Sequence, residues 1–227
     1  PGYAMGDIQT SAAYVRYAVE RIAVESGRNV DVITHSQGGM EARWAVKWFP
    51  AVRRDIDDLV LIASPNHGIL LGDVCADAGN CWPAAWQMAH DSHFLAALNR
   101  GDETPGAISY TNVYSRTDEL VEPSTTVPMK GASNIAVQDV CLRAVHHAGL
   151  LTDSVAWAVV MDALTHRGPA DVRRIHANVC NSTFMPGVTA GQVINGNATL
   201  YGNAALHFAE APGVRSEPPL RRYARQP

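Results

Sequence analysis

The feature that most constrains this chain is a short strand, a serine and a helix in immediate succession. Residues 30–34 (VDVIT) are mostly β-branched and predict a short strand. The segment THSQGG spans 34–39, and a helix is predicted from about residue 40 until Pro50 stops it. This order matches the nucleophile elbow G-x-S-x-G, with a threonine in place of the first glycine. Such a turn strains the backbone at Ser36, so small residues are expected two positions before and after it, as Gly38 illustrates.

The chemistry expected of such an elbow is attack by the serine on a carbonyl carbon. The turn would raise the Ser36 hydroxyl above the sheet, and the N–H of Gln37, at the start of the helix, would stabilise an oxyanion. The alternative is an ordinary strand-to-helix turn with a capping serine.

Strands and helices alternate along the chain, which predicts a mostly parallel α/β sheet flanked by helices. The segment 58–63 (DLVLIA) is almost continuously apolar, as in a strand that is buried on both faces. We expect a single domain over 1–227, with a lid-like excursion at 65–106 and a C-terminal extension at 183–227. Further expected elements are helices at 7–26, 86–99, 153–165 and 191–208, and strands at 107–114 and 134–138.

A serine nucleophile needs a base, and the base needs an acid to orient it. In sheets of this kind the acid and then the histidine follow the serine along the chain, each after a later strand. The segment after strand 107–114 contains Asp118 and Glu119, and the segment after strand 134–138 contains His146 and His147. Spacing alone leaves both choices open.

Composition excludes several classes of protein. The 227 residues carry a net charge of −4, which argues against a nucleic-acid partner, and no apolar run is long enough to span a membrane. The four cysteines lack metal-ligand spacing, so we expect no metal, and nothing indicates a cofactor. Their even number favours two disulfides and an oxidising compartment, although four reduced buried thiols are the alternative. The pairing is open at this point.

Several stretches, in the right order, resemble the Candida antarctica lipase B family of α/β-hydrolase lipases and its actinobacterial relatives. They are THSQGG, RWAVKWFP (43–50), YTNVYSRTDELVEP (110–123), NIAVQDVC (134–141), HHAGLLT (146–152) and PPLRRYAR (218–225). The resemblance implies an α/β-hydrolase fold in which Ser36 is the nucleophile, Asp118 the acid and His147 the base. It implies that Gln37 supplies an oxyanion N–H.

The resemblance also implies the cysteine pairing and three neighbours of the substrate. It pairs Cys141 with Cys180 and Cys75 with Cys81. The residues that it places in the substrate pocket are His35, Asn66 and Leu120.

The function expected from these features is that of a secreted serine carboxylester hydrolase, a lipase or esterase working through an acyl-enzyme. Its partner would be a lipid or ester substrate, for which a lipid–water interface is one place of encounter, and the full-length protein would be a monomer. Alternatives are a thioesterase, acyltransferase or polyester depolymerase on the same triad, and a non-catalytic binding protein of the same fold. A second oxyanion donor should come from a loop before residue 1. We therefore expect the early strands to be missing from this chain, and the chain alone to be weakly active or inactive.

Overall fold

A four-stranded parallel sheet forms the centre of the molecule, of which the computed structural model describes residues 4–225. The strands are β1 (Val30–His35), β2 (Ile56–Ile62), β3 (Ser109–Tyr114) and β4 (Ser133–Ala136), and they pair in that order. All three pairings are parallel, so the four strands end at the same edge of the sheet. The predicted parallel α/β sheet is confirmed.

Strand β2 is buried on both faces, as its continuous apolar sequence predicts. Val60 and Ile62 belong to the core on one side of the sheet, whereas Leu59 and Leu61 belong to the core on the other side. The alternation follows from the period of two residues along a strand. Because both faces are covered, the sheet can position the loops at its edge rigidly.

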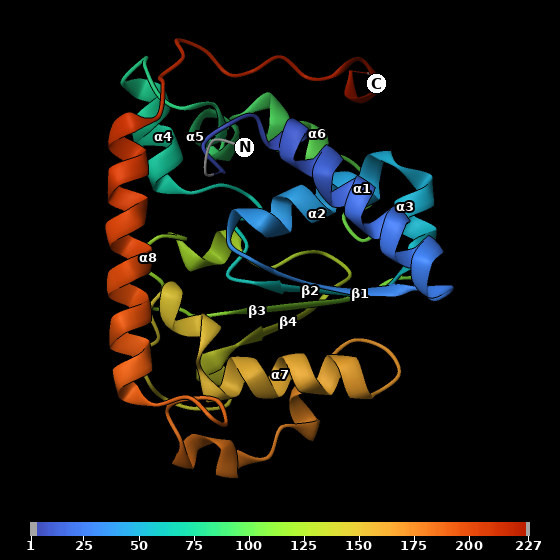
Figure 1. Cartoon of the computed structure of the whole chain (residues 1–227), viewed down its shortest axis with the longest axis vertical. Coiled ribbons are helices and arrows are strands. Elements are labelled where there is room, and N and C mark those ends of the chain that lie inside the picture. The colour runs from blue at the N-terminus through green and yellow to red at the C-terminus, as the bar shows by residue number, and fades with distance from the viewer. Residues whose placement is uncertain (1–3, 226–227) are drawn as a thin grey trace.

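Helices cover the two faces of the sheet (Figure 1). On one face lie α1 (Ile8–Ser26), α2 (Gln37–Trp48) and α3 (Pro50–Asp55), and on the other lies α7 (Ser154–Thr165). The contacts agree with this view, because α2 packs on β1 while α7 packs on β2 and β3. The order helix, sheet, helix is the three-layer arrangement of α/β proteins.

The ends of α1 and α7 have clear sequence causes. Asp7 caps α1, because its carboxylate accepts the N–H of Gln9, and Gly27 ends the helix in the left-handed region at φ 66°. Asp153 caps α7 by accepting two backbone N–H groups of the first turn.

The segment 65–106 holds more helix than the sequence indicates. It contains α4 (Leu70–Asp77), α5 (Pro83–Met88) and α6 (His93–Asn99), where the sequence predicts one helical patch. Helix α4 was missed because Gly72 interrupts its pattern. That glycine is needed for space, since a Cβ there would lie 2.7 Å from the backbone of Met88.

The longest helix, α8 (Ala190–Glu210), stands across the edge at which the strands end (Figure 1). It begins with a capping box formed by Thr189 and Gln192. Among the helices of residues 4–225, none is long and apolar enough to cross a membrane. Short 3-10 turns lie at Ser124–Thr126, Val137–Asp139, Ala148–Leu151, Val172–Arg174, Ala177–Asn181 and Arg222–Ala224.

The structure contains both disulfides that the family resemblance implies. Cys141 pairs with Cys180 at a sequence separation of 39, and Cys75 pairs with Cys81 at a separation of 6. In the loop-entropy model, the longer closure stabilises the fold by roughly 4 kcal/mol and the shorter by roughly 2.5 kcal/mol. The longer bridge joins the segment after β4 to the segment after α7.

Candidate functional site

Ser36 occupies the turn between β1 and α2 in a conformation that few non-glycine residues adopt. Its φ is 56° and its ψ is −133°, which places the residue among the strained positions that cost of order 1–3 kcal/mol. Two hydrogen bonds hold it there: its N–H donates to Ile62 O at 2.8 Å, and its carbonyl accepts from Gly39 N at 3.0 Å. The strained elbow is therefore present at the predicted serine.

The spatial need for glycine lies one residue later than the elbow pattern indicates. A Cβ added at Gly38 would lie 3.9 Å from Thr34 Cβ, which is an ordinary contact. A Cβ added at Gly39 would lie 2.6 Å from Ser64 Cβ. Gly39 is required because the first turn of α2 packs directly against the segment after β2, and this neighbour cannot be read from local sequence.

Asp118 and His147 form a buried pair at the same edge of the sheet. Asp118 follows β3, His147 follows β4, and Asp118 Oδ2 lies 2.8 Å from His147 Nδ1. Asp118 Oδ1 accepts the backbone N–H groups of Leu120 and Val121, both at 2.9 Å. A carboxylate at Nδ1 keeps the proton on that nitrogen and leaves Nε2 free to accept one.

The surroundings of Asp118 favour its charged form. Burial works to raise the pKa of this carboxyl, but the hydrogen bond and charge of His147 and the two backbone N–H groups outweigh it. The pKa of Asp118 is therefore held below its usual value. An ionised acid at this position can stabilise positive charge on the histidine.

The turn that carries Ser36 contacts this pair through His35. The ring of His35, the preceding residue, is 4.7 Å from the ring of His147, and its Nε2 is 3.1 Å from His147 O. In the described part of the chain, however, no hydrogen bond joins the Ser36 hydroxyl to His147. The structure thus brings the acid and the histidine together, and it brings His35, the residue before Ser36, into contact with the histidine.

The two residues that the spacing left as alternatives are also at the site. Glu119 Oε2 accepts the backbone N–H of His147 at 3.0 Å and lies 3.4 Å from Nδ1 of His146. The His146 side chain is 75% exposed, whereas that of His147 is 7% exposed. Burial and the bond to Asp118 favour His147 as the base.

The other residues predicted to contact the substrate differ in their exposure and in their free hydrogen-bonding groups. Gln37 begins α2, so its backbone N–H has no partner within the helix. Leu120 is 39% exposed next to the acid. Asn66 is fully buried: its Oδ1 accepts from Arg43 and Ser64, and its Nδ2 donates to Val127 O. Its side-chain polar atoms are directed into the protein, and a substrate role for it stays a prediction.

His35 gives the site a pH-dependent stability. Burial first, and the neighbouring charge of His147 second, lower the pKa of His35 from 6.5 to about 4. Below pH 6.5 His35 binds a proton in the unfolded chain, whereas in the folded chain it stays neutral until about pH 4. The free energy of unfolding therefore decreases as the pH falls from 6.5 to about 4. We expect a loss of about 2 kcal/mol between about pH 7 and pH 5 from this group.

The measurement is urea unfolding at both pH values for the unsubstituted chain and for His35→Phe. The variant should lose less stability on acidification, since the other titrating groups are unchanged. His176→Phe, at an exposed position, is the matched control and should behave like the unsubstituted chain. Equal acid sensitivity in all three proteins would contradict the assigned environment of His35.

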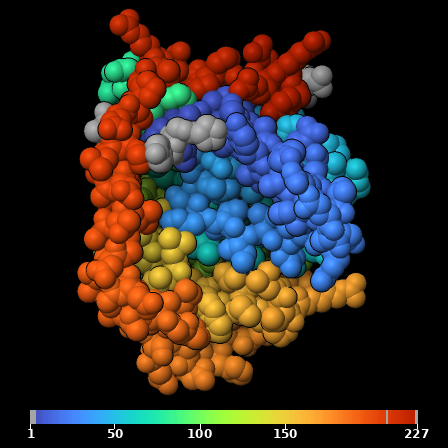
Figure 2. All heavy atoms as spheres, in the orientation of Figure 1, coloured from blue at the N-terminus to red at the C-terminus, as the bar shows by residue number. Residues whose placement is uncertain are grey.

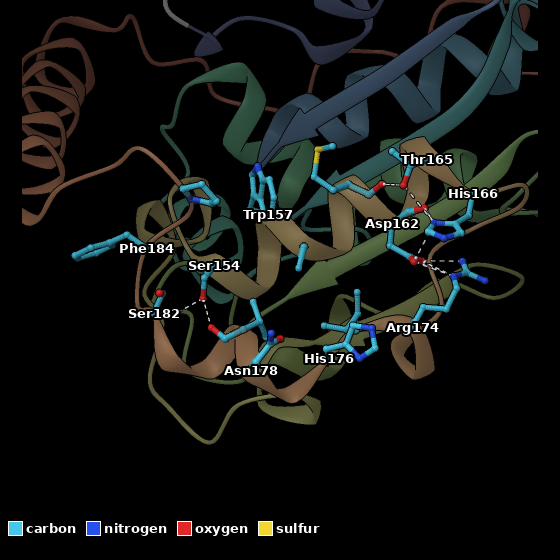
Figure 3. Close-up of a pocket in the computed structure, with 15 residues that line it drawn as sticks. Ser154, Trp157, Asp162, Thr165, His166, Arg174, His176, Asn178, Ser182 and Phe184 are labelled. Atoms are coloured by element: carbon cyan, nitrogen blue, oxygen red, sulfur yellow. Dashed lines mark hydrogen bonds and ion pairs between the residues drawn. The ribbon is translucent and has the colours of Figure 1, made fainter.

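A cavity of about 610 Å³ lies elsewhere, on the outer side of α7 (Figure 3). Its lining includes apolar Trp157 and Phe184, and several of the polar side chains that face it, such as Asp162 and Arg174, are bonded to one another. Arg174 donates to Asp162 through two nitrogens, so the Asp162 carboxylate is neutralised by an ion pair and is a poor candidate for a catalytic acid or base. Within residues 4–225 there is no group of three or more His, Cys, Asp or Glu side chains that could hold a metal ion.

Known proteins resemble this chain over nearly its whole length. The family model "Lipase (class 2)" matches residues 10–156. Lipase B of Pseudozyma antarctica is 30% identical over 235 residues, covering 99% of this chain and 68% of that protein. The crystal structure of Aspergillus fumigatus lipase B superposes with a TM-score of 0.89 at 29% identity, covering 99% of this chain. This chain spans 57% of that solved protein.

A more distant structure shares the fold alone. The Bacillus licheniformis lipase BlEst2, in its propeptide form, has a TM-score of 0.59 at 16% identity, covering 73% of this chain and 42% of that one. Together the matches assign an α/β-hydrolase fold.

Proposed function

This chain belongs to the class 2 lipase family, and on that premise we propose that it is a serine carboxylester hydrolase of lipase type. The observation that carries the proposal is the buried pair of Asp118 and His147 at the sheet edge where Ser36 occupies a strained turn. A buried, oriented histidine beside a strained serine is the arrangement that nucleophilic acyl transfer needs.

In the proposed reaction the Ser36 oxygen attacks the ester carbonyl carbon while His147 Nε2 takes the hydroxyl proton. Asp118 keeps the ring in the required tautomer and stabilises the imidazolium. The backbone N–H of Gln37 donates to the oxyanion. When the tetrahedral intermediate collapses, the bond to the alcohol oxygen breaks, and His147 gives its proton to that oxygen. Water then attacks the acyl carbon while His147 Nε2 takes one of its protons, and the bond to Ser36 Oγ breaks as His147 returns that proton to the serine oxygen, which frees the acid.

The mechanism requires the Ser36 hydroxyl to reach His147 Nε2 when substrate binds. Hydrogen bonds between catalytic groups are often long in a free enzyme and tighten in the complex. A side-chain rotation at Ser36 is the smallest movement that would make the bond.

We also propose a lipid or ester substrate, a monomeric full-length protein and secretion into an oxidising compartment. The two disulfides support the last point, because disulfides persist in such compartments. The family supports the lipid or ester substrate.

The proposal is tested by incubating the protein with a fluorophosphonate and locating the adduct by mass spectrometry. We expect one adduct, on the peptide that contains Ser36, and none on protein unfolded by heat, because only the folded site activates the hydroxyl. Hydrolysis of p-nitrophenyl butyrate, compared with thioester, polyester and acyl-acceptor substrates, separates an ester hydrolase from the other acyl-transfer enzymes. A folded protein that stays unlabelled would indicate a non-catalytic member of the fold.

A further inference from the structure

The main chain of His147 is held by side chains on both sides. Glu119 Oε2 accepts its N–H at 3.0 Å, and His35 Nε2 lies 3.1 Å from its carbonyl oxygen. His147 precedes the short turn Ala148–Leu151 and lies in no strand. These two side-chain contacts therefore help to fix the position of its backbone.

The second oxygen of the same carboxylate reaches α8. The hydroxyl of Tyr201 donates to Glu119 Oε1 at 3.0 Å, although the two residues are 82 positions apart. The backbone of Ala148 also faces the Tyr201 hydroxyl. Figure 2 shows the yellow surface near residue 150 emerging between the orange α8 and the blue N-terminal third of the chain. One carboxylate thus joins the histidine loop to α8.

Glu119 is charged in this environment. Burial works to raise the pKa of Glu119, but the N–H of His147, the backbone of Glu119 itself and the hydroxyl of Tyr201 outweigh it. The pKa is held below its usual value, so the carboxylate accepts both hydrogen bonds at neutral pH. Hydrogen bonds to a charged acceptor are stronger and shorter than neutral ones.

We propose that Glu119 is a positioning residue that holds the backbone of His147 in place and makes that position depend on the docking of α8 through Tyr201. The proposal rests on the assignment of His147 as the base. Asp118 fixes the rotation and tautomer of the ring, whereas Glu119 fixes where the ring is anchored. Displacement of a base by about 1 Å can lower the reaction rate about 10²-fold, so the position of the His147 backbone affects the rate as well as the orientation of the ring does.

Two other roles for Glu119 predict different results. One is that its charge acts on the ring of His147, which Asp118 and His35 also contact, and the other is that it only stabilises the fold. Glutamine separates the first role from positioning. Its amide oxygen can accept the N–H of His147 while its NH₂ donates to the Tyr201 oxygen, so it keeps the geometry and removes the charge.

The experiment compares Glu119→Ala, Glu119→Gln and Tyr201→Phe with the unsubstituted full chain. We expect kcat on p-nitrophenyl butyrate to fall about tenfold to hundredfold in Glu119→Ala and about threefold to tenfold in Tyr201→Phe, with KM nearly unchanged. Glu119→Gln should stay within about threefold of the unsubstituted chain. Glu122→Ala, which removes an exposed carboxylate of the same loop, is the matched control and should leave kcat unchanged.

A second readout does not depend on activity. Hydrogen–deuterium exchange of the peptide around residues 144–152 should be faster in Glu119→Ala and Tyr201→Phe than in the Glu122→Ala control. Equal exchange and equal kcat in all variants would overturn the inference. A Glu119→Gln variant as slow as Glu119→Ala would show a charge effect instead, and parallel losses of Tm and activity would show a structural role. If the unsubstituted chain is not labelled by a fluorophosphonate, the proposed function fails, while the exchange rates still test the link to α8.

Discussion

Replacing Ser36 with alanine is expected to lower kcat/KM for p-nitrophenyl butyrate by about 10⁶-fold, as loss of the nucleophile does in serine hydrolases of unrelated fold. Removal of the oxygen leaves His147 without a hydroxyl to deprotonate, so no acyl-enzyme forms. The comparison is made against the unsubstituted chain at equal concentration, with fluorophosphonate labelling as the second readout. A variant that keeps activity within tenfold would place the nucleophile elsewhere.

A glycine at the same position separates loss of chemistry from loss of fold. Alanine keeps the Cβ that strains the backbone at φ 56°, whereas glycine adopts this region freely. We expect Ser36→Gly to be as inactive as Ser36→Ala but about 1 kcal/mol more stable to urea unfolding. A glycine variant that is less stable than the alanine variant would contradict the strain assigned to the elbow.

The fold could be predicted wherever local pattern and burial agree. The apolar run of β2 predicts a buried strand and the β-branched run of β1 predicts a short strand, and both form next to each other in the sheet. The expected helices of residues 7–26 and 153–165 appear as α1 and α7 within one residue of the expected bounds. Each of these elements combines a clear period with a capping or terminating residue.

The site could be predicted only in part, because its precision comes from contacts between distant segments. The order of acid and histidine after successive strands narrowed each role to two adjacent residues, and the family resemblance chose Asp118 and His147. The bond between them agrees with that choice. The sequence suggests Glu119 only as an alternative to Asp118 for the acid. In the structure its carboxylate instead accepts a hydrogen bond from the backbone N–H of His147.

Other contacts leave no trace in local sequence. Tyr201 lies in a helix whose pattern says nothing about the loop that its hydroxyl meets. The burial of Asn66 depends on Arg43 from α2 and on the carbonyl of Val127, which come from different parts of the chain. The need for Gly39 arises from Ser64 across a packing contact. In each case the partner is set by tertiary packing, which a motif of neighbouring residues cannot encode.

The acid of the proposed triad offers a test of the histidine tautomer. In Asp118→Asn the amide oxygen can still accept the hydrogen bonds from the backbone N–H groups of Leu120 and Val121. The NH₂ group is then turned toward His147 Nδ1. An N–H donor at Nδ1 forces the ring proton to Nε2, where it blocks acceptance of the serine proton.

We therefore expect kcat to fall about 10⁴-fold in Asp118→Asn while the urea midpoint changes little, because volume and two backbone hydrogen bonds are retained. Asp139→Asn is the matched control: this carboxylate bonds the N–H of Ala136 and the exposed Arg116, and its loss should leave kcat unchanged. Labelling of Ser36 by a fluorophosphonate should slow in parallel with kcat, since both depend on the same proton transfer. A loss of less than about tenfold in kcat would mean that the tautomer of His147 is set by another group, and Asp118 would then have no part in the chemistry.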